Sequence, residues 1–231
     1  IGLTGGGVMK LDLAEISSEL FSYNSTWFKA DVADLQVFEK NGDLAFLANN
    51  LRTNIDFPSR EGLFFSNGLG SYVTLPANQF ICYIDKLEWK MDEQKLKLSQ
   101  SNETKNNGSR FISIHPNQDS LTFIAKSANY NLNDNIIYSS GVDSVLVADA
   151  VIFPDSGNII VEKDANILPL LNSKIITNNL TRYHVFTNAS IDIKSANNYL
   201  ASGDYVYENA LKIKQNVFFN DISVDIDTIT N

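Results

Sequence analysis

The chain has 231 residues, with 18 Lys and Arg against 27 Asp and Glu, so its formal net charge is -9. This acidic balance argues against nucleic acid as a partner, because affinity for a nucleic-acid backbone comes from basic side chains that displace counterions. A hydrophobic content of 44% provides for a buried core, in one large all-β domain or in two smaller ones.

No apolar run approaches the roughly eighteen residues of a membrane-spanning helix, and no transmembrane segment is expected. The chain starts at Ile1 without a leader segment, which we interpret as a processed or excised fragment of something longer.

Apolar and polar residues alternate with a period of two along most of the chain, which predicts β-strands and few or no helices. The three glycines at 5–7 have no phosphate-binding context and favour a flexible start or a β-bulge. Clusters of Asn, Asp and Gly between the alternating runs predict turns. The clearest strands, in chain order, are 35–38, 111–114, 159–161, 191–193 and 222–226, and the clearest turns are 40–43, 66–68, 106–108, 133–135 and 155–158.

The segment from Asp85 to Lys97 has alternating apolar residues, and we favour a hairpin over a short helix there. Cys82 lies in an apolar run and is expected to be a small buried hydrophobe. Residues 99–109 contain no apolar side chain and predict a polar loop. This loop divides the chain into a β-rich N-terminal half, 1–98, and a β-repeat C-terminal half, 110–231, which together also suit one continuous β domain.

A short pattern recurs, in which a large apolar residue is followed two positions later by Ala and then by another small or apolar residue. Its copies start at Phe28, Phe123, Leu146 and Tyr199, and each is followed by an apolar strand and a turn. A unit of this size must stack on its neighbours to bury its apolar face, so we expect stacked strand-turn-strand repeats.

Four residues are the candidate ligand-binding site: Tyr83, Asp85, Glu88 and Trp89, in which carboxylates stand among aromatic rings. Such rings could stack on a sugar, and paired carboxylates could process one. The alternative is that the aromatics are sheet residues and the acidic groups are their solvated neighbours. His115 and His184 have no second ligand at metal spacing, and no catalytic residue, metal or cofactor is predicted.

The segments VADAVIFPDSGNIIVEKDANI, NSKIITNNLTRYHVFTNASIDI and YLASGDYVYE resemble large envelope-associated proteins of Bacteroidota-type bacteria, with the rhythm of OstA/LptA-like β repeats. The resemblance implies a β-solenoid or an open β-jelly-roll, a periplasmic or cell-envelope location, and a scaffolding or lipid-handling role. It transfers no functional residue.

We therefore expect an all-β, non-enzymatic protein that serves as a structural scaffold or handles a lipid or glycolipid. Its partners would be that lipid, a second copy paired through sheet edges, or neighbouring repeats of a longer chain. The alternative function is a carbohydrate-binding or carbohydrate-processing β-sandwich.

Overall fold

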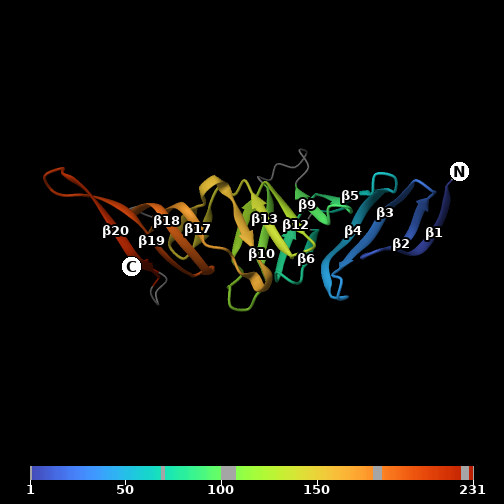
Figure 1. The fold of residues 1–231 in the computed structure, drawn as a ribbon, viewed down its shortest axis with the longest axis horizontal. Coiled ribbons are helices and arrows are strands. Elements are labelled where there is room, and N and C mark those ends of the chain that lie inside the picture. Colours follow the sequence, from blue (N-terminus) through green and yellow to red (C-terminus); the bar gives the residue numbers. More distant parts are fainter. Residues whose placement is uncertain (1, 69–70, 100–107, 179–183, 225–228, 231) are drawn as a thin grey trace.

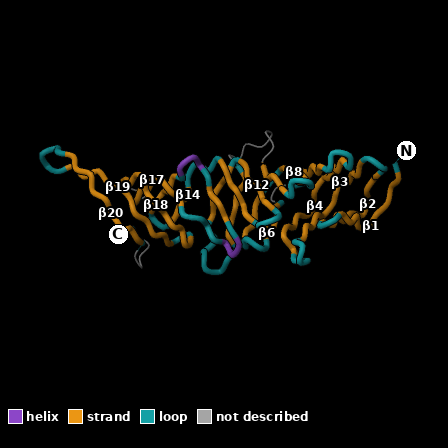
Figure 2. Tube along the Cα trace, viewed as in Figure 1, coloured by secondary structure: helices purple, strands orange, loops and turns teal. Residues whose placement is uncertain are grey.

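The computed structural model describes residues 2–68, 71–99, 108–178, 184–224 and 229–230. Over these residues the protein is almost entirely β-structure, with two 3₁₀ turns of three residues each (Figure 2), and the all-β prediction is confirmed. The elements follow one another along a long axis, with β1 at one end and the hairpin of β19 and β20 at the other (Figure 1).

The element bounds are as follows. The first half contains β1 (Leu3–Leu11), β2 (Ala14–Tyr23), β3 (Trp27–Phe38), β4 (Leu44–Asp56), β5 (Glu61–Ser66), β6 (Tyr72–Leu75), β7 (Phe80–Tyr83), β8 (Lys86–Lys90), β9 (Lys95–Ser99) and β10 (Ser109–Ser113). The second half contains β11 (Thr122–Ala125), β12 (Ser127–Asn131), β13 (Ile136–Ser140), β14 (Val145–Val147), β15 (Ala150–Phe153), η1 (Asp155–Gly157), β16 (Ile159–Val161), η2 (Lys163–Ala165), β17 (Leu170–Thr177), β18 (His184–Ser195), β19 (Asn198–Glu208) and β20 (Lys214–Ser223).

The larger sheet has fourteen described strands and divides at β4 into two branches. Leu47 and Ala48 of β4 pair with β6, whereas Leu51–Asp56 of the same strand pair with β5. One branch continues in the order β6, β7, β10, β11, and the other in the order β5, β8, β9, β12, β13, β16. All these pairs are antiparallel, and the sheet curls into a half-barrel.

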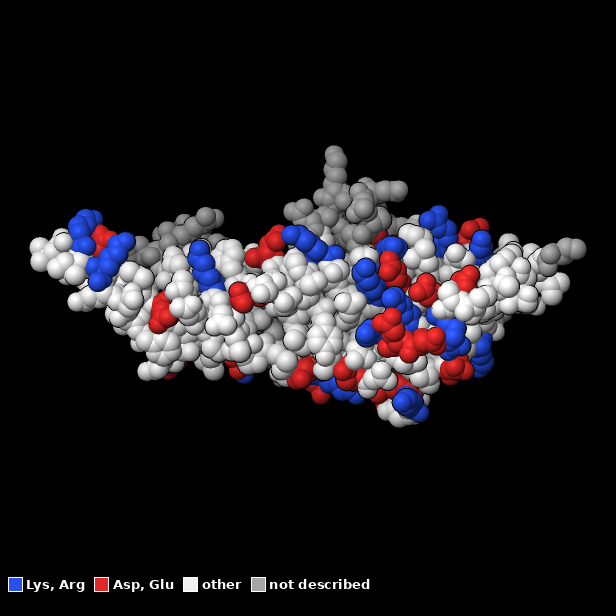
Figure 3. Space-filling model, turned by 45° about the horizontal axis from the view of Figure 1, so that its top comes forward, with Lys and Arg blue, Asp and Glu red and all other residues white. Residues whose placement is uncertain are grey.

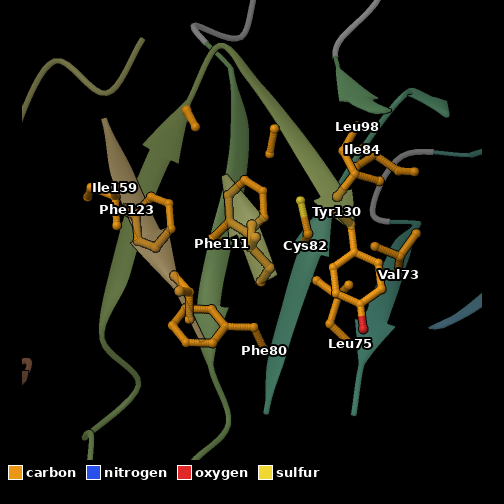
Figure 4. Packing of buried hydrophobic residues seen from close by; sticks show 14 of the residues in the cluster. Val73, Leu75, Phe80, Cys82, Ile84, Leu98, Phe111, Phe123, Tyr130 and Ile159 are labelled. Carbon is orange, nitrogen blue, oxygen red and sulfur yellow. The ribbon is translucent and has the colours of Figure 1, made fainter. Parts of the chain in front are cut away.

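The two branches enclose the central core. Phe111 of β10 and Phe123 of β11 stack with their ring centroids 5.0 Å apart, next to Phe80 and Cys82 of β7 (Figure 4). Tyr130, on the other branch, donates its hydroxyl to Ala45 O and to Asn135 Oδ1, at 3.2 and 2.7 Å. Burial raises the pKa of the Tyr130 phenol, so the hydroxyl keeps the proton that it donates.

A buried amide joins the turns of the two branches. Asn78, between β6 and β7, donates from Nδ2 to the carbonyl oxygens of Asn135, Val161 and Glu162, at 2.7, 3.2 and 3.0 Å. Its neighbour Gln79 donates to Asp164 of η2. The branches are thus tied to each other by polar contacts as well as by apolar packing.

A second sheet of six described strands has the order β14, β15, β17, β18, β19, β20. It meets the larger sheet where β14 contacts β11 and where the backbone N–H of Ala196 donates to Gln118 O at 3.0 Å. The buried apolar residues of both sheets form one continuous cluster. The two sheets therefore share a core.

Both ends of the molecule contain rows of β-bulges. The pairing of β1 with β2 shifts register between Gly5 and Gly7, which confirms the bulge alternative for the glycine run. The pairing of β3 with β4 shifts between Ala30 and Ala33, and similar shifts occur across β17 to β20. Because bulges bend strands and increase their twist, these rows curve the long strands at each end.

Several local predictions are confirmed. The segment 85–97 is a hairpin of β8 and β9, the predicted strands at 35–38, 111–114, 159–161 and 191–193 coincide with β3, β10, β16 and β18 to within a residue, and Cys82 is buried. Residues 100–107 of the predicted polar loop and 225–226 of the last predicted strand lie outside the described residues. The strands on either side of that loop, β9 and β10, belong to opposite branches of the same sheet.

The four copies of the apolar-Ala pattern occupy different places. The copy at Phe28 lies within β3, and the copy at Tyr199 lies within β19. The copy at Phe123 spans β11 and β12, which are on opposite branches, and the copy at Leu146 forms the tight turn between β14 and β15. The strand-turn-strand rhythm is present as successive hairpins rather than as four superposable units.

Candidate functional site

The four candidate ligand residues are divided between the two branches. Tyr83 ends β7 on one branch, whereas Glu88 and Trp89 follow each other in β8 on the other, with Asp85 in the connection between these strands. Consecutive strand residues point to opposite faces of a sheet. Trp89 is only 5% exposed and faces the core, so the ring and the Glu88 carboxylate do not form one surface.

Glu88 belongs to a charged surface on the outer face of β8 and β9. It forms ion pairs with Lys86 at 2.5 Å and with Lys97 at 3.9 Å. The hydrogen bond and the charge of Lys86 lower the pKa of the Glu88 carboxyl, so this group is ionised at neutral pH and is not a proton donor. Its environment is that of a solvated sheet residue.

The same charged surface contains a shallow hollow of about 440 Å³. Glu93 lies between Lys90 and Lys95, at 3.2 and 3.3 Å, and Tyr138 of β13 closes one side of the hollow. Figure 3 shows that basic and acidic side chains are mixed over this part of the molecule. Because the opposite charges neutralise each other locally, the hollow has no strong preference for a cation or an anion.

Tyr83 contributes to a different surface, made with Tyr72 and Arg110. Tyr72 lies opposite Tyr83 on β6, with the ring centroids 5.8 Å apart, and the Arg110 guanidinium lies 4.6 Å from the centroid of the Tyr83 ring. Tyr72 is 49% exposed. Of the predicted aromatics, Tyr83 is therefore the one on an accessible aromatic surface.

Other reactive groups are dispersed. The described residues contain no group of three potential metal ligands and no helix that could cross a bilayer. Burial raises the pKa of the Cys82 thiol well above its ordinary value, which suppresses the reactive thiolate. His115 accepts from the backbone N–H of Asn117, and His184 contacts the hydroxyl of Tyr205, so the histidines have separate local partners.

The most exposed apolar surfaces lie at the two ends of the molecule. Among the described residues β1 pairs with β2 alone and β20 pairs with β19 alone, so each sheet ends in a long strand with an open edge. The exposed large apolar side chains at the β1 end are Leu3, Val8, Leu20 and Val32, and those at the β20 end are Val206, Tyr207, Leu211, Ile213, Val217, Phe218 and Phe219. An open edge of this kind is a template for pairing with another strand.

The β20 end also has an aromatic cluster. Phe186, Tyr205 and Phe219 lie on adjacent strands with ring centroids 5.4 to 5.9 Å apart, and Phe219 meets both other rings edge to face. Phe186 is buried, whereas Phe219 is exposed on the edge strand. The cluster thus extends the core outward to the last strand.

Sequence reasoning missed both ends. It recognised the alternation at Ile222, but residues 206–221 are all at least half-buried or exposed irrespective of their polarity. The available signal was the run VYENALKIKQNVFF, where apolar residues continue through a turn without a partner segment of matching pattern.

Comparison with protein-family models, with curated proteins and with solved structures found no match to this chain.

Proposed function

We propose that the protein is a non-enzymatic β-sheet scaffold that assembles through its end strands. The observation that carries the proposal is the pair of open edges, β1 and β20, at opposite ends of an elongated molecule (Figure 1). The exposed apolar side chains on these strands support it, because an unprotected apolar edge normally associates with another strand. A location in the cell envelope stays a prediction.

Lysine on either edge strand should reduce self-association. Val8 and Phe218 are 52% and 56% exposed, so V8K and F218K leave the core intact but add a charge that opposes strand pairing. Size-exclusion chromatography with light scattering should show mass rising with concentration for the unmodified chain and a smaller rise for each variant.

The control is Y138K, which makes a similar change on β13, a strand that is paired on both sides. Its mass should follow that of the unmodified chain. A chain that is strictly monomeric at high concentration, or edge variants that associate as well as Y138K, would rule the proposal out.

A lipid-surface function is a second candidate, favoured by the tip of the β19–β20 hairpin. Leu211 is 78% exposed, and Ile213 is also exposed, between Lys212 and Lys214. Turn tips are usually polar, whereas this one presents two large apolar residues flanked by lysines, as membrane-surface segments do.

The tip is held in shape by Asn209. Its Oδ1 accepts the backbone N–H groups of Leu211 and Ile213, at 2.9 and 3.0 Å, and its own backbone N–H donates to Ile213 O. The apolar side chains are therefore presented by an ordered turn.

We expect the double variant L211D/I213D to lose most binding to vesicles of phosphatidylcholine and phosphatidylglycerol in a flotation assay. The added carboxylates cannot enter the acyl region and are repelled by the anionic headgroups. The matched control is L146D, since Leu146 is an exposed leucine on β14. Equal flotation of both variants, or no flotation of the unmodified chain, would contradict a lipid-binding tip.

A further inference from the structure

The two end strands are complementary to each other, and this inference rests on the proposed edge-to-edge assembly. We infer that β20 of one copy pairs with β1 of the next copy, head to tail and in parallel orientation. The alternative joints are β1 with β1 and β20 with β20.

The direction of the strands supports the parallel orientation. In Figure 1 β1 and β20 lie at opposite ends of the long axis, and both begin at the upper side of the view and run downwards. A second copy displaced along that axis in the same orientation therefore places its β1 beside β20 with the same chain direction. The strands have nine and ten residues, so they can pair along almost their whole length.

The side chains of the two strands differ in bulk in a complementary way. If the strand starts are aligned, with Leu3 beside Lys214, the three glycines of β1 lie beside Asn216, Val217 and Phe218. Bulky side chains next to edge glycines cover backbone that would otherwise be bare. A joint between two β1 strands in which the glycine runs meet would instead set glycine beside glycine and leave Val217 and Phe218 exposed.

The glycine run is required by the chain itself. A Cβ at Gly6 would lie 2.3 Å from the carbonyl oxygen of Glu19 on β2. The register shift between Gly5 and Gly7 lies at the same place. β1 therefore keeps a segment without side chains at its open edge, and a partner strand must supply the bulk.

The same alignment brings opposite charges together. Lys10 of β1 comes beside Asp221 of β20, both exposed. Lys10 already pairs with Glu15 on β2 at 2.8 Å, so Asp221 of the neighbouring copy would complete a row of alternating charges across the joint. Opposite charges on neighbouring strands stabilise pairing, and like charges oppose it.

Cross-linking of two cysteine variants tests the joint. Thr4 and Gln215 are exposed polar residues that the alignment places side by side, and the native Cys82 is fully buried and unreactive towards a maleimide. An equimolar mixture of T4C and Q215C, with the two chains distinguished by a size tag, is treated with a short bismaleimide. The expected product is the mixed T4C–Q215C dimer in excess over both homodimers.

The outcomes separate this inference from the proposed function. Homodimers without the mixed product, or a self-associating chain that gives no cross-link, would overturn the head-to-tail joint while leaving edge assembly intact. A chain that gives no cross-link and is monomeric by light scattering would overturn both.

Charge exchange provides an independent readout. K10E or D221K alone should weaken self-association by roughly two- to tenfold, and K10E/D221K should restore most of it, because the pair is re-formed with reversed signs. Failure of the double variant to recover association beyond the single variants would show that these residues do not meet at the joint.

Discussion

Replacing Phe111 by alanine should lower the free energy of unfolding by about 3–5 kcal/mol. The side chain is fully buried on β10, where it stacks on Phe123 between the two branches (Figure 4). In register it lies between Cys82 of β7 and Phe123 of β11. The surrounding strands are hydrogen-bonded on both sides and cannot collapse into the space left by the ring, so a cavity remains.

The measurement is the midpoint of urea unfolding, with the slope checked for two-state behaviour. The control is I112A, which truncates the next residue of the same strand, on the opposite and less buried face. It should cost about 1 kcal/mol or less. Equal midpoints for F111A and I112A would show that the centre of the core does not lie between these branches.

Replacing Asn78 by aspartate should destabilise the protein by about 3 kcal/mol or more at neutral pH. The change is nearly isosteric, but it replaces a donor that serves three buried carbonyl oxygens by a group that accepts hydrogen bonds. A carboxylate would be repelled by the carbonyls of Asn135, Val161 and Glu162 and would have no water to solvate it.

The pH dependence gives this prediction a second readout. Burial and carbonyl repulsion raise the pKa of the introduced carboxyl in the folded state above its unfolded value. The folded variant therefore binds more protons than the unfolded one over this interval, and its stability relative to the unmodified chain should increase as the pH falls. A protonated carboxyl can again donate one hydrogen bond.

The matched control is N133D, an exposed Asn-to-Asp change in the neighbouring turn between β12 and β13. It should change the unfolding midpoint little at any pH. If N78D unfolds at the same midpoint as N133D at neutral pH, the branches are not joined through this amide.

Local structure followed from the sequence wherever a short-range pattern decided it. The alternation of Leu87, Trp89, Leu96 and Leu98 was sufficient for the β8–β9 hairpin, because the period of two sets which side chains face the core. The burial of Cys82 followed in the same way from the apolar run around it.

The candidate site was harder to derive. Glu88 and Trp89 are adjacent in the chain, and the same alternation places them on opposite faces of β8. Tyr83 acquires its neighbours Tyr72 and Arg110 from other strands of its branch, Arg110 being separated from it along the chain by the polar loop. A single strand's pattern contains no information about which distant strand becomes its partner.

By itself, the sequence determined the all-β class, the positions of most strands and turns, the acidic solvated face and the buried state of Cys82. All of these depend on residue type and on a period of two. The tertiary structure alone decided that β4 pairs with two different strands, that the branches close around Phe111 and Tyr130, and that β1 and β20 become the ends. These features depend on hydrogen bonds between strands far apart in the chain, so whether a strand is an edge or an interior strand is settled only when the whole sheet has formed.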